Sequence, residues 1–318
     1  MEQTETIGGV LLSSTMDLKS FYGLDFTGSS SQVRLFDPHE VSDPASIRFA
    51  VCWLPDDDAF ARYPNLQMAM SVGAGVDALL ANPSLAEDSL ICRVRDPHQA
   101  DLMAGYAAHE ALHFLRSFTL MKDQQSARIW NPLPMSPPKE TRIAVLGNGT
   151  MGAAIARALS AMGFSVTVAC RCEPREPQAG ISYHSGANAL DMACKGSRIA
   201  INVLPLTDET ENILNGRLFN QLEPGAWLIQ IGRGEHLHEA DFAAALDNGQ
   251  LAGASLDVFR EEPLPKSHPF WHDDRLRITP HIASDSTPSV VAEQICASAV
   301  ELLQGKRPQL AIDRHQGY

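Results

Sequence analysis

RIAVLGNGTMGAAIARALSAMGFSVTVACR, residues 142–171, is the stretch that decides the fold. Its apolar run over 143–146 predicts a buried parallel strand, and a glycine-rich turn over 147–152 follows at once. The alanine-rich segment to about residue 162 predicts a helix, and the apolar run over 164–170 predicts the next strand. A strand, a G-x-G-x-x-G turn, a helix and a second strand in this order are typical of dinucleotide-binding proteins.

The turn also predicts how a dinucleotide would be bound. Gly147, Gly149 and Gly152 allow the backbone to turn tightly and to approach a pyrophosphate. Thr150 and Met151 begin the helix, whose free N–H groups and partial positive charge favour an anion. We therefore expect these five residues to bind the cofactor; the alternative is an ordinary glycine turn in an α/β protein.

Length and charge limit the possible functions. A chain of 318 residues is long enough for two domains, and its 44% hydrophobic and 20% charged residues are typical of a soluble globular protein. A net charge of −13 argues against a nucleic-acid partner, because phosphate contacts need a basic surface. An anionic substrate would therefore need local positive groups.

The cysteines and the apolar runs predict a cytoplasmic location. The six cysteines are scattered, and Cys170-x-Cys172 is too short a spacing for a usual zinc half-site, so we expect reduced thiols and no metal. The first residues include Glu2 and Glu5 and resemble no secretory signal. No apolar run approaches the length of a membrane span.

Alternating elements predict two α/β domains. Apolar runs over 9–12, 33–36, 49–54 and 66–72 predict strands of a first unit. After a proline-rich connector over 130–139, further strands are expected over 198–204, 226–231, 252–258 and 276–279, with helices over 239–246 and 288–303. We predict a Rossmann-type doubly wound parallel sheet in a dinucleotide-binding domain, residues 101–285. Residues 1–100 and 286–318 should form a smaller, flavodoxin-like α/β substrate domain.

One segment matches a metal-binding motif. A helical pattern runs from Asp101 to about Asp123, and within it His109, Glu110 and His113 form H-E-A-L-H, a literal match to the zincin motif. The helix is apolar on several faces, so we favour two histidines in or beside a helix interface over a zinc site.

Three charged residues each follow a predicted strand of the second domain. Arg233 follows the strand that ends at Ile231, Glu262 the strand that ends near Val258, and His281 the strand that ends at Thr279. Each alone has an ordinary structural explanation. Because parallel strands present their carboxyl ends at one edge, the three together indicate a catalytic site.

Several segments resemble the D-2-hydroxyacid dehydrogenase family. They are the fingerprint, VLPLTDET at 203–210, IGRG at 231–234, LDVFREEPLP at 256–265 and TPHIAS at 279–284, with weaker support from VGAGVDALL at 72–80. The resemblance implies a homodimer that reduces small 2-oxo acids such as glyoxylate and hydroxypyruvate to D-2-hydroxy acids. It also implies that the cofactor contacts Leu204, Pro205, Ile231 and Asp257.

The family mechanism gives each charged residue a role. The resemblance implies that His281 donates a proton to the substrate carbonyl oxygen, while Glu262 orients the imidazole and favours its charged form. Arg233 would hold the substrate carboxylate and carbonyl. The backbone at Gly73, Ala74 and Gly75 would bind the rest of the carboxylate, and Trp53 would limit substrate size.

The end of the second fingerprint strand predicts the cofactor. NAD-binding proteins usually place an Asp or Glu there for the ribose 2′-hydroxyl, whereas this chain has Arg171, and a guanidinium binds a 2′-phosphate well. We therefore predict NADP, with NADPH preferred over NADH. Two alternatives stay open: a dehydrogenase of a bulkier D-2-hydroxy acid, and a cofactor-sensing protein similar to the corepressors of this fold.

Overall fold

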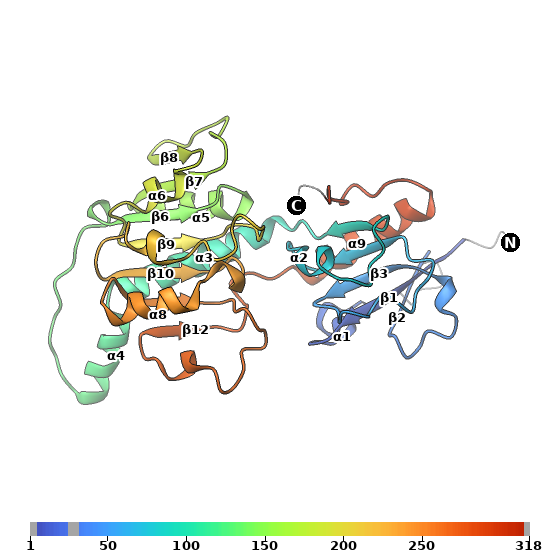
Figure 1. Ribbon diagram of the computed structural model, residues 1–318, viewed down its shortest axis with the longest axis horizontal. Coiled ribbons are helices and arrows are strands. Elements are labelled where there is room, and N and C mark those ends of the chain that lie inside the picture. Colours follow the sequence, from blue (N-terminus) through green and yellow to red (C-terminus); the bar gives the residue numbers. More distant parts are fainter. Residues whose placement is uncertain (1–4, 25–31, 315–318) are drawn as a thin grey trace. The chain divides into compact units, whose positions relative to one another are not determined.

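The computed structural model describes residues 5–24 and 32–314, and it divides them into two compact units. One unit combines the described residues up to His98 with those from Asp285 onward, and the other is the continuous segment Gln99–Ser284. The chain therefore passes twice between the units (Figure 1).

The continuous unit is built on one parallel sheet. Among the described residues, the sheet has seven strands in the order β12-β11-β10-β9-β6-β7-β8. Its strands are β6 (Arg142–Leu146), β7 (Ser165–Cys170), β8 (Ile181–Ser185), β9 (Ile199–Asn202), β10 (Ala226–Gln230), β11 (Leu251–Leu256) and β12 (Leu276–Ile278). The strand order reverses direction between β6 and β9, which is where such sheets bind ligands. The Rossmann-type doubly wound sheet is confirmed.

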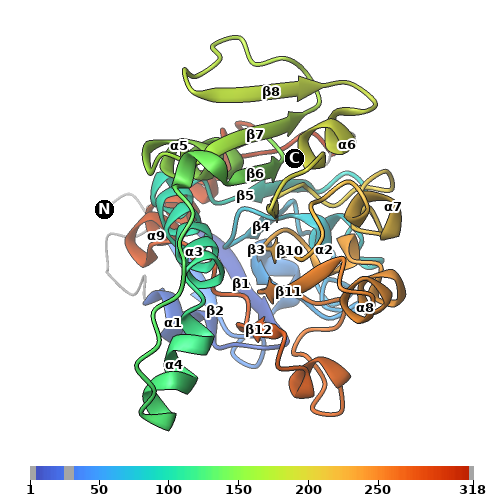
Figure 2. The same ribbon diagram turned by 90° about the vertical axis from the view of Figure 1, so that its left-hand side faces the viewer.

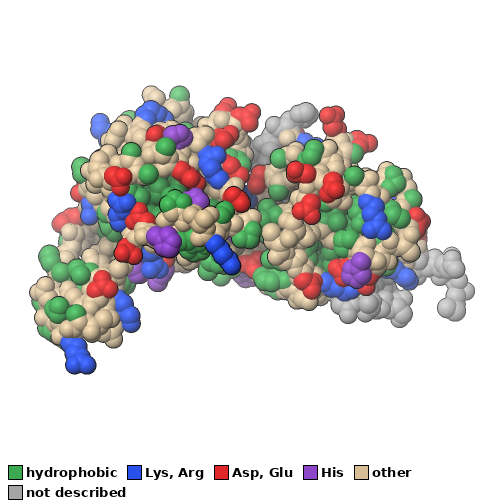
Figure 3. Space-filling view, turned by 60° about the horizontal axis from the view of Figure 1, so that its bottom comes forward, with side chains coloured by type: hydrophobic (Ala, Val, Ile, Leu, Met, Phe, Trp, Pro, Cys, Tyr) green, Lys and Arg blue, Asp and Glu red, His purple; other side chains and the backbone are tan. Residues whose placement is uncertain are grey.

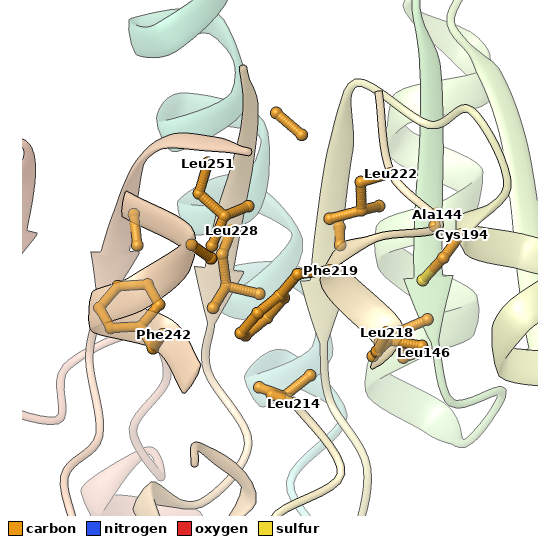
Figure 4. Close-up of a cluster of buried hydrophobic side chains, with 14 of the residues drawn as sticks. Ala144, Leu146, Cys194, Leu214, Leu218, Phe219, Leu222, Leu228, Phe242 and Leu251 are labelled. Atoms are coloured by element: carbon orange, nitrogen blue, oxygen red, sulfur yellow. The ribbon is translucent and has the colours of Figure 1, made fainter. Parts of the chain in front are cut away.

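Helices cover both faces of this sheet (Figure 2). One face packs against α3 (Pro97–Leu115) and α5 (Thr150–Ala161), and the other against α6 (Ala189–Cys194), α7 (Gly216–Phe219) and α8 (Glu239–Asp247). On the second face, Phe219 of α7 and Phe242 of α8 pack with Leu228 of β10 (Figure 4). Because both faces are buried, the central strands consist mainly of apolar residues.

The other unit has a smaller sheet of the same kind. Among the described residues it contains five parallel strands in the order β2-β1-β3-β4-β5. They are β1 (Ile7–Ser13), β2 (Val33–Phe36), β3 (Ile47–Trp53), β4 (Met68–Ser71) and β5 (Leu90–Arg93). Helices α1 (Leu18–Tyr22) and α9 (Pro288–Leu303) cover one face, and α2 (Asp77–Leu80) packs on the other. This order is that of flavodoxin-like sheets, as predicted.

The helix expected over 101–123 is two helices. α3 ends at Leu115, and α4 (Phe118–Ala127) begins after Ser117, whose backbone is left-handed with φ of 52°. A left-handed residue cannot continue an α-helix, so the chain changes direction there. In Figure 1, α4 and the segment that follows it extend away from the sheet of their unit.

The described residues include no helix that is long and apolar enough to cross a membrane. All six cysteines have free thiols. On the face drawn in Figure 3, acidic side chains are spread over both units, with lysine and arginine side chains among them.

Candidate active site

His281 and Glu262 form a close pair at the carboxyl edge of the larger sheet. The imidazole Nδ1 of His281 lies 2.7 Å from a carboxylate oxygen of Glu262, whose other oxygen accepts the N–H of Phe259 at 2.9 Å. A carboxylate can only accept a hydrogen bond, so Nδ1 carries a proton. Nε2 is then the ring nitrogen that is available for proton transfer. Both side chains keep about a fifth to a quarter of their surface exposed, 25% for His281 and 21% for Glu262.

The backbone at His281 is held in an uncommon conformation. His281 has φ of 56°, in the left-handed region that residues other than glycine seldom occupy. Its N–H donates to the carbonyl of Asp257 at 2.9 Å. The carboxylate of Asp257, which is 1% exposed, accepts the N–H groups of Ile282 and Ala283, each at 2.8 Å. These bonds offset the cost of the left-handed turn.

Arg233 lies in the loop after β10 and directly precedes the short helix η3 (Gly234–His236). Its N–H donates to Nδ1 of His236 at 3.0 Å, and its carbonyl accepts the side-chain amide of Gln230 at 2.7 Å. A Cβ at Gly234 would lie 1.9 Å from the backbone of Phe259, so only glycine fits there. The Arg233 loop therefore packs directly against the loop that carries Glu262.

Buried polar residues that the sequence reasoning missed support Arg233. His236 is 0% exposed, and its Nδ1 accepts hydrogen bonds from Arg233 and from the amide of Asn202 at 2.9 Å. Nε2 must then carry the proton, which it donates to the carbonyl of Pro205 at 3.2 Å. Asn202 and Gln230 are the last residues of β9 and β10. Their position, as polar residues at the end of an apolar strand, was the sequence feature that could have identified Asn202 and Gln230.

The fingerprint loop has the shape that a pyrophosphate requires. Gly147 has φ of 113°, and a Cβ at Gly152 would lie 2.0 Å from the carbonyl oxygen of Gly147. A Cβ at Gly149 would meet nothing within 4 Å, so the backbone at the start of α5 is accessible. The glycines therefore fit a dinucleotide: two bring helix and strand together, and the third leaves room for the ligand.

The loops around the fingerprint contain the other predicted cofactor contacts. Leu204 and Pro205 follow β9, Ile231 follows β10 and Asp257 follows β11. Arg171 is exposed directly after β7. These positions all lie at the carboxyl edge, on both sides of the point where the strand order reverses.

The predicted substrate residues of the other unit lie together at the carboxyl edge of its sheet. Trp53 ends β3, and its ring would be 3.1 Å from a Cβ placed on Gly73. The N–H of Gly73 donates to the hydroxyl of Ser71 at 3.2 Å, and the carbonyl of Ala74 accepts a hydrogen bond from Arg93 at 3.1 Å. The structure thus places Trp53 beside the Gly73–Gly75 loop within this unit.

The H-E-A-L-H segment of α3 makes contacts within its own unit. The carboxylate of Glu110, whose side chain is 2% exposed, pairs with Arg277 of β12 at 2.7 and 3.1 Å and accepts the hydroxyl of Ser255 at 2.6 Å. Nε2 of His113 lies 3.1 Å from Arg277. Among the described residues, the group with metal-ligand geometry is Asp37, His39 and Glu40, which is separate from this motif.

Comparison with known proteins identifies the class of protein that this fold and edge define. Residues 109–283 match the family model "D-isomer specific 2-hydroxyacid dehydrogenase, NAD binding domain". The chain belongs to the D-isomer specific 2-hydroxyacid dehydrogenase family.

Particular relatives narrow the comparison. The chain is 37% identical over 303 residues to glyoxylate/hydroxypyruvate reductase A of Serratia proteamaculans, covering 93% of this chain and 95% of that one. The structure is similar to a D-isomer specific 2-hydroxyacid dehydrogenase of Xanthobacter autotrophicus in complex with NADPH, with TM-score 0.85, 32% identity and coverage of 98% and 100%. It is also similar to an NADPH-dependent glyoxylate/hydroxypyruvate reductase of Sinorhizobium meliloti with NADP and sulfate, with TM-score 0.88, 28% identity and the same coverage.

Proposed function

We propose that this protein is an NADPH-dependent reductase that converts small 2-oxo acids, such as glyoxylate and hydroxypyruvate, to D-2-hydroxy acids. The observation that carries the proposal is the 2.7 Å contact between His281 and Glu262 at the carboxyl edge of a dinucleotide-binding sheet. Relatives that the chain matches over most of its length have this activity in their names.

The chain's own residues supply the proton and the substrate contacts. Glu262 holds Nδ1 of His281, which directs Nε2 to the carbonyl oxygen of the substrate as the proton donor. The guanidinium of Arg233 binds the carboxylate and carbonyl of the 2-oxo acid, and so fixes the carbonyl carbon for reduction. The N–H groups at Gly73, Ala74 and Gly75 bind the remaining carboxylate oxygen, and Trp53 limits the size of the substrate.

The residues at the carboxyl edge fit a phosphorylated dinucleotide. When bound, NADPH supplies the hydride that reduces the carbonyl carbon. The backbone from Gly147 to Gly152, with Thr150 and Met151, holds the pyrophosphate, and Arg171 binds the 2′-phosphate. Leu204, Pro205, Ile231 and Asp257 complete the contacts.

NADPH oxidation at 340 nm with a panel of 2-oxo acids of increasing size tests this function. We expect turnover with glyoxylate and hydroxypyruvate, and weaker turnover with bulkier acids. Turnover only with bulky acids would instead indicate a dehydrogenase of a larger substrate, and no oxidation with any acid would favour a cofactor-sensing role.

The role of His281 is tested separately by His281→Gln, with NADPH binding measured by fluorescence titration. We expect kcat to fall at least about 100-fold, the range of general acid catalysis, while the Kd of NADPH stays within about twofold. Unchanged turnover would exclude His281 as the proton donor.

The same proposal includes a homodimer formed through the continuous unit, residues 99–284. α4 has no buried residue of its own, and Phe118 and Trp130 in and after it are 47% and 98% exposed. An isolated helix of this length is not stable in water, so a second copy that covers it would stabilise it. The free cysteines favour a reducing, cytoplasmic environment, and the net charge of −13 disfavours a nucleic-acid partner.

A further inference from the structure

One stripe of α3 contacts three strands of the larger sheet in turn. Tyr106, Glu110 and Phe114 are spaced by four residues and therefore lie on one side of the helix. Tyr106 contacts Thr279 after β12, and Glu110 contacts Arg277 of β12 and Ser255 of β11. The ring of Phe114 stacks on Trp227 of β10 with centroids 4.8 Å apart.

Hydrogen bonds connect Tyr106 to the loop that contains His281. Its hydroxyl lies 2.7 Å from that of Thr279, which in turn bonds to the carboxylate of Asp257. Because a carboxylate can only accept, Thr279 donates to Asp257, and Tyr106 must then donate to Thr279. The same carboxylate accepts the N–H groups of Ile282 and Ala283, next to His281. The hydrogen bonds from the helix and those from the loop thus meet at the carboxylate of Asp257, which accepts all of them.

The ion pair of Glu110 and Arg277 fixes the position of α3 and hence of Tyr106, where this chain of hydrogen bonds begins. Both guanidinium bonds end on a carboxylate whose side chain is 2% exposed, and Ser255 donates to the same carboxylate. Trp227 donates in turn to the Ser255 hydroxyl at 3.0 Å. An ion pair with a buried carboxylate and this many directional bonds permits little sliding of the helix along the sheet.

We propose that Tyr106 is a positioning residue: through Thr279 and Asp257 it holds the left-handed loop that aims His281. This inference rests on the proposed function for its catalytic consequence, since His281 is the proton donor there. The contacts themselves are independent of any substrate, so part of the test needs no activity.

The kinetic test compares variants of the full-length protein that remove or keep one hydroxyl. Tyr106→Phe and Thr279→Val each remove a hydroxyl from the chain of bonds, and Thr279→Ser keeps it. We expect kcat to fall about 3- to 10-fold in the first two, the effect of one hydrogen bond, and to stay within about twofold in Thr279→Ser. The KM for NADPH should change less than kcat. Tyr63→Phe, at a buried tyrosine of the other unit, is the control.

Hydrogen exchange of the backbone amides at residues 281–283 provides the readout that a general loss of stability does not give. We expect about 3- to 10-fold faster exchange at these amides in Tyr106→Phe and Thr279→Val, and wild-type exchange in Tyr63→Phe and Thr279→Ser. The proposal would be overturned if these amides exchanged at the wild-type rate in Tyr106→Phe. It would also be overturned if kcat fell equally in Thr279→Ser and Thr279→Val. If the wild-type enzyme turned over no 2-oxo acid, the proposed function would fail, and the exchange data would still decide the positioning role.

Discussion

Arg171 and Arg175 are the exposed cations that follow β7. The strand ends in Cys170 rather than in an acidic residue, so the carboxylate that would repel a 2′-phosphate is missing from that position. Glu173 lies between the two arginines and reduces the local positive charge. We therefore expect a preference for NADPH to depend mainly on Arg171.

Replacing Arg171 by Ala should raise the KM for NADPH about tenfold, because a charge-assisted hydrogen bond to phosphate is lost. The KM for NADH should stay within about twofold, since NADH carries no phosphate there. Steady-state kinetics with each cofactor measures both values, and Arg157→Ala, at an exposed arginine on α5, is the matched control. An equal rise for NADH and NADPH would show that Arg171 does not select the phosphate.

For single residues, the sequence indicated which side chains follow strands, but not which hydrogen bonds position them. Arg233, Glu262 and His281 were predictable as candidates because each comes after an apolar run. The geometry of His281 was not, since it depends on Asp257 and Thr279, which bond to the loop only once β11 and β12 are paired. Likewise, nothing local showed that His236 would bury its ring beside Arg233.

Among the elements, α3 combines a structural and an electrostatic role. Burial and the nearby positive charge of Arg277 lower the pKa of His113 below its ordinary value of 6.5. Arg277 donates toward Nε2 of His113, which requires the neutral imidazole. Protonation of His113 would place two positive charges together at the contact between α3 and β12.

The sign of the pH effect follows from this lowered pKa. The folded protein favours neutral His113, so its contribution to stability is present above pH 6.5 and is lost as the pH falls through the lower folded pKa. We expect the Tm of the wild type to fall more between pH 7 and pH 5 than that of His113→Gln, measured by differential scanning calorimetry. His272→Gln, at an exposed histidine, should follow the wild type. Parallel curves for wild type and His113→Gln would contradict this explanation.

The elements were predicted well where apolar runs were long and flanked by turns. β2 and α9 have the predicted bounds, and most other strands differ by only a few residues at their ends. β5 and β8 were missed: β5 has four residues, and β8 is a polar edge strand whose residues are half-buried or exposed. The break at Ser117 was missed as well, because the residues on both sides of it favour a helix.

At the scale of the whole molecule, α4 is a ten-residue helix with no buried residue. Besides Phe118 and Trp130, Leu120 and Ile129 are 45% and 57% exposed. The lobe at the left of Figure 3 carries such apolar side chains next to charged ones. Exposed apolar residues in this number are typical of an interface between copies of a protein.

Trp130→Glu and Phe118→Glu, tested singly, should convert the proposed dimer to a monomer. Each places a charge in an apolar contact, and loss of a central aromatic residue commonly weakens an interface by about 2 kcal/mol or more, roughly 30-fold in Kd. Sedimentation velocity over a concentration series measures the change. Met192→Glu, an exposed apolar residue on α6, should leave the Kd unaltered. A monomeric wild-type protein would refute the proposed assembly.

The position of α9 has a consequence for how the chain folds during synthesis. Val291, Ile295 and Ala299 of α9 are fully buried against β1, β3 and β4, although the ribosome makes them only after the whole continuous unit. The part of that apolar face that α9 covers therefore stays without this cover while residues 99–284 are made. The part of the chain that is translated first should thus be the last to complete its core, with apolar surface exposed to aggregation in the meantime.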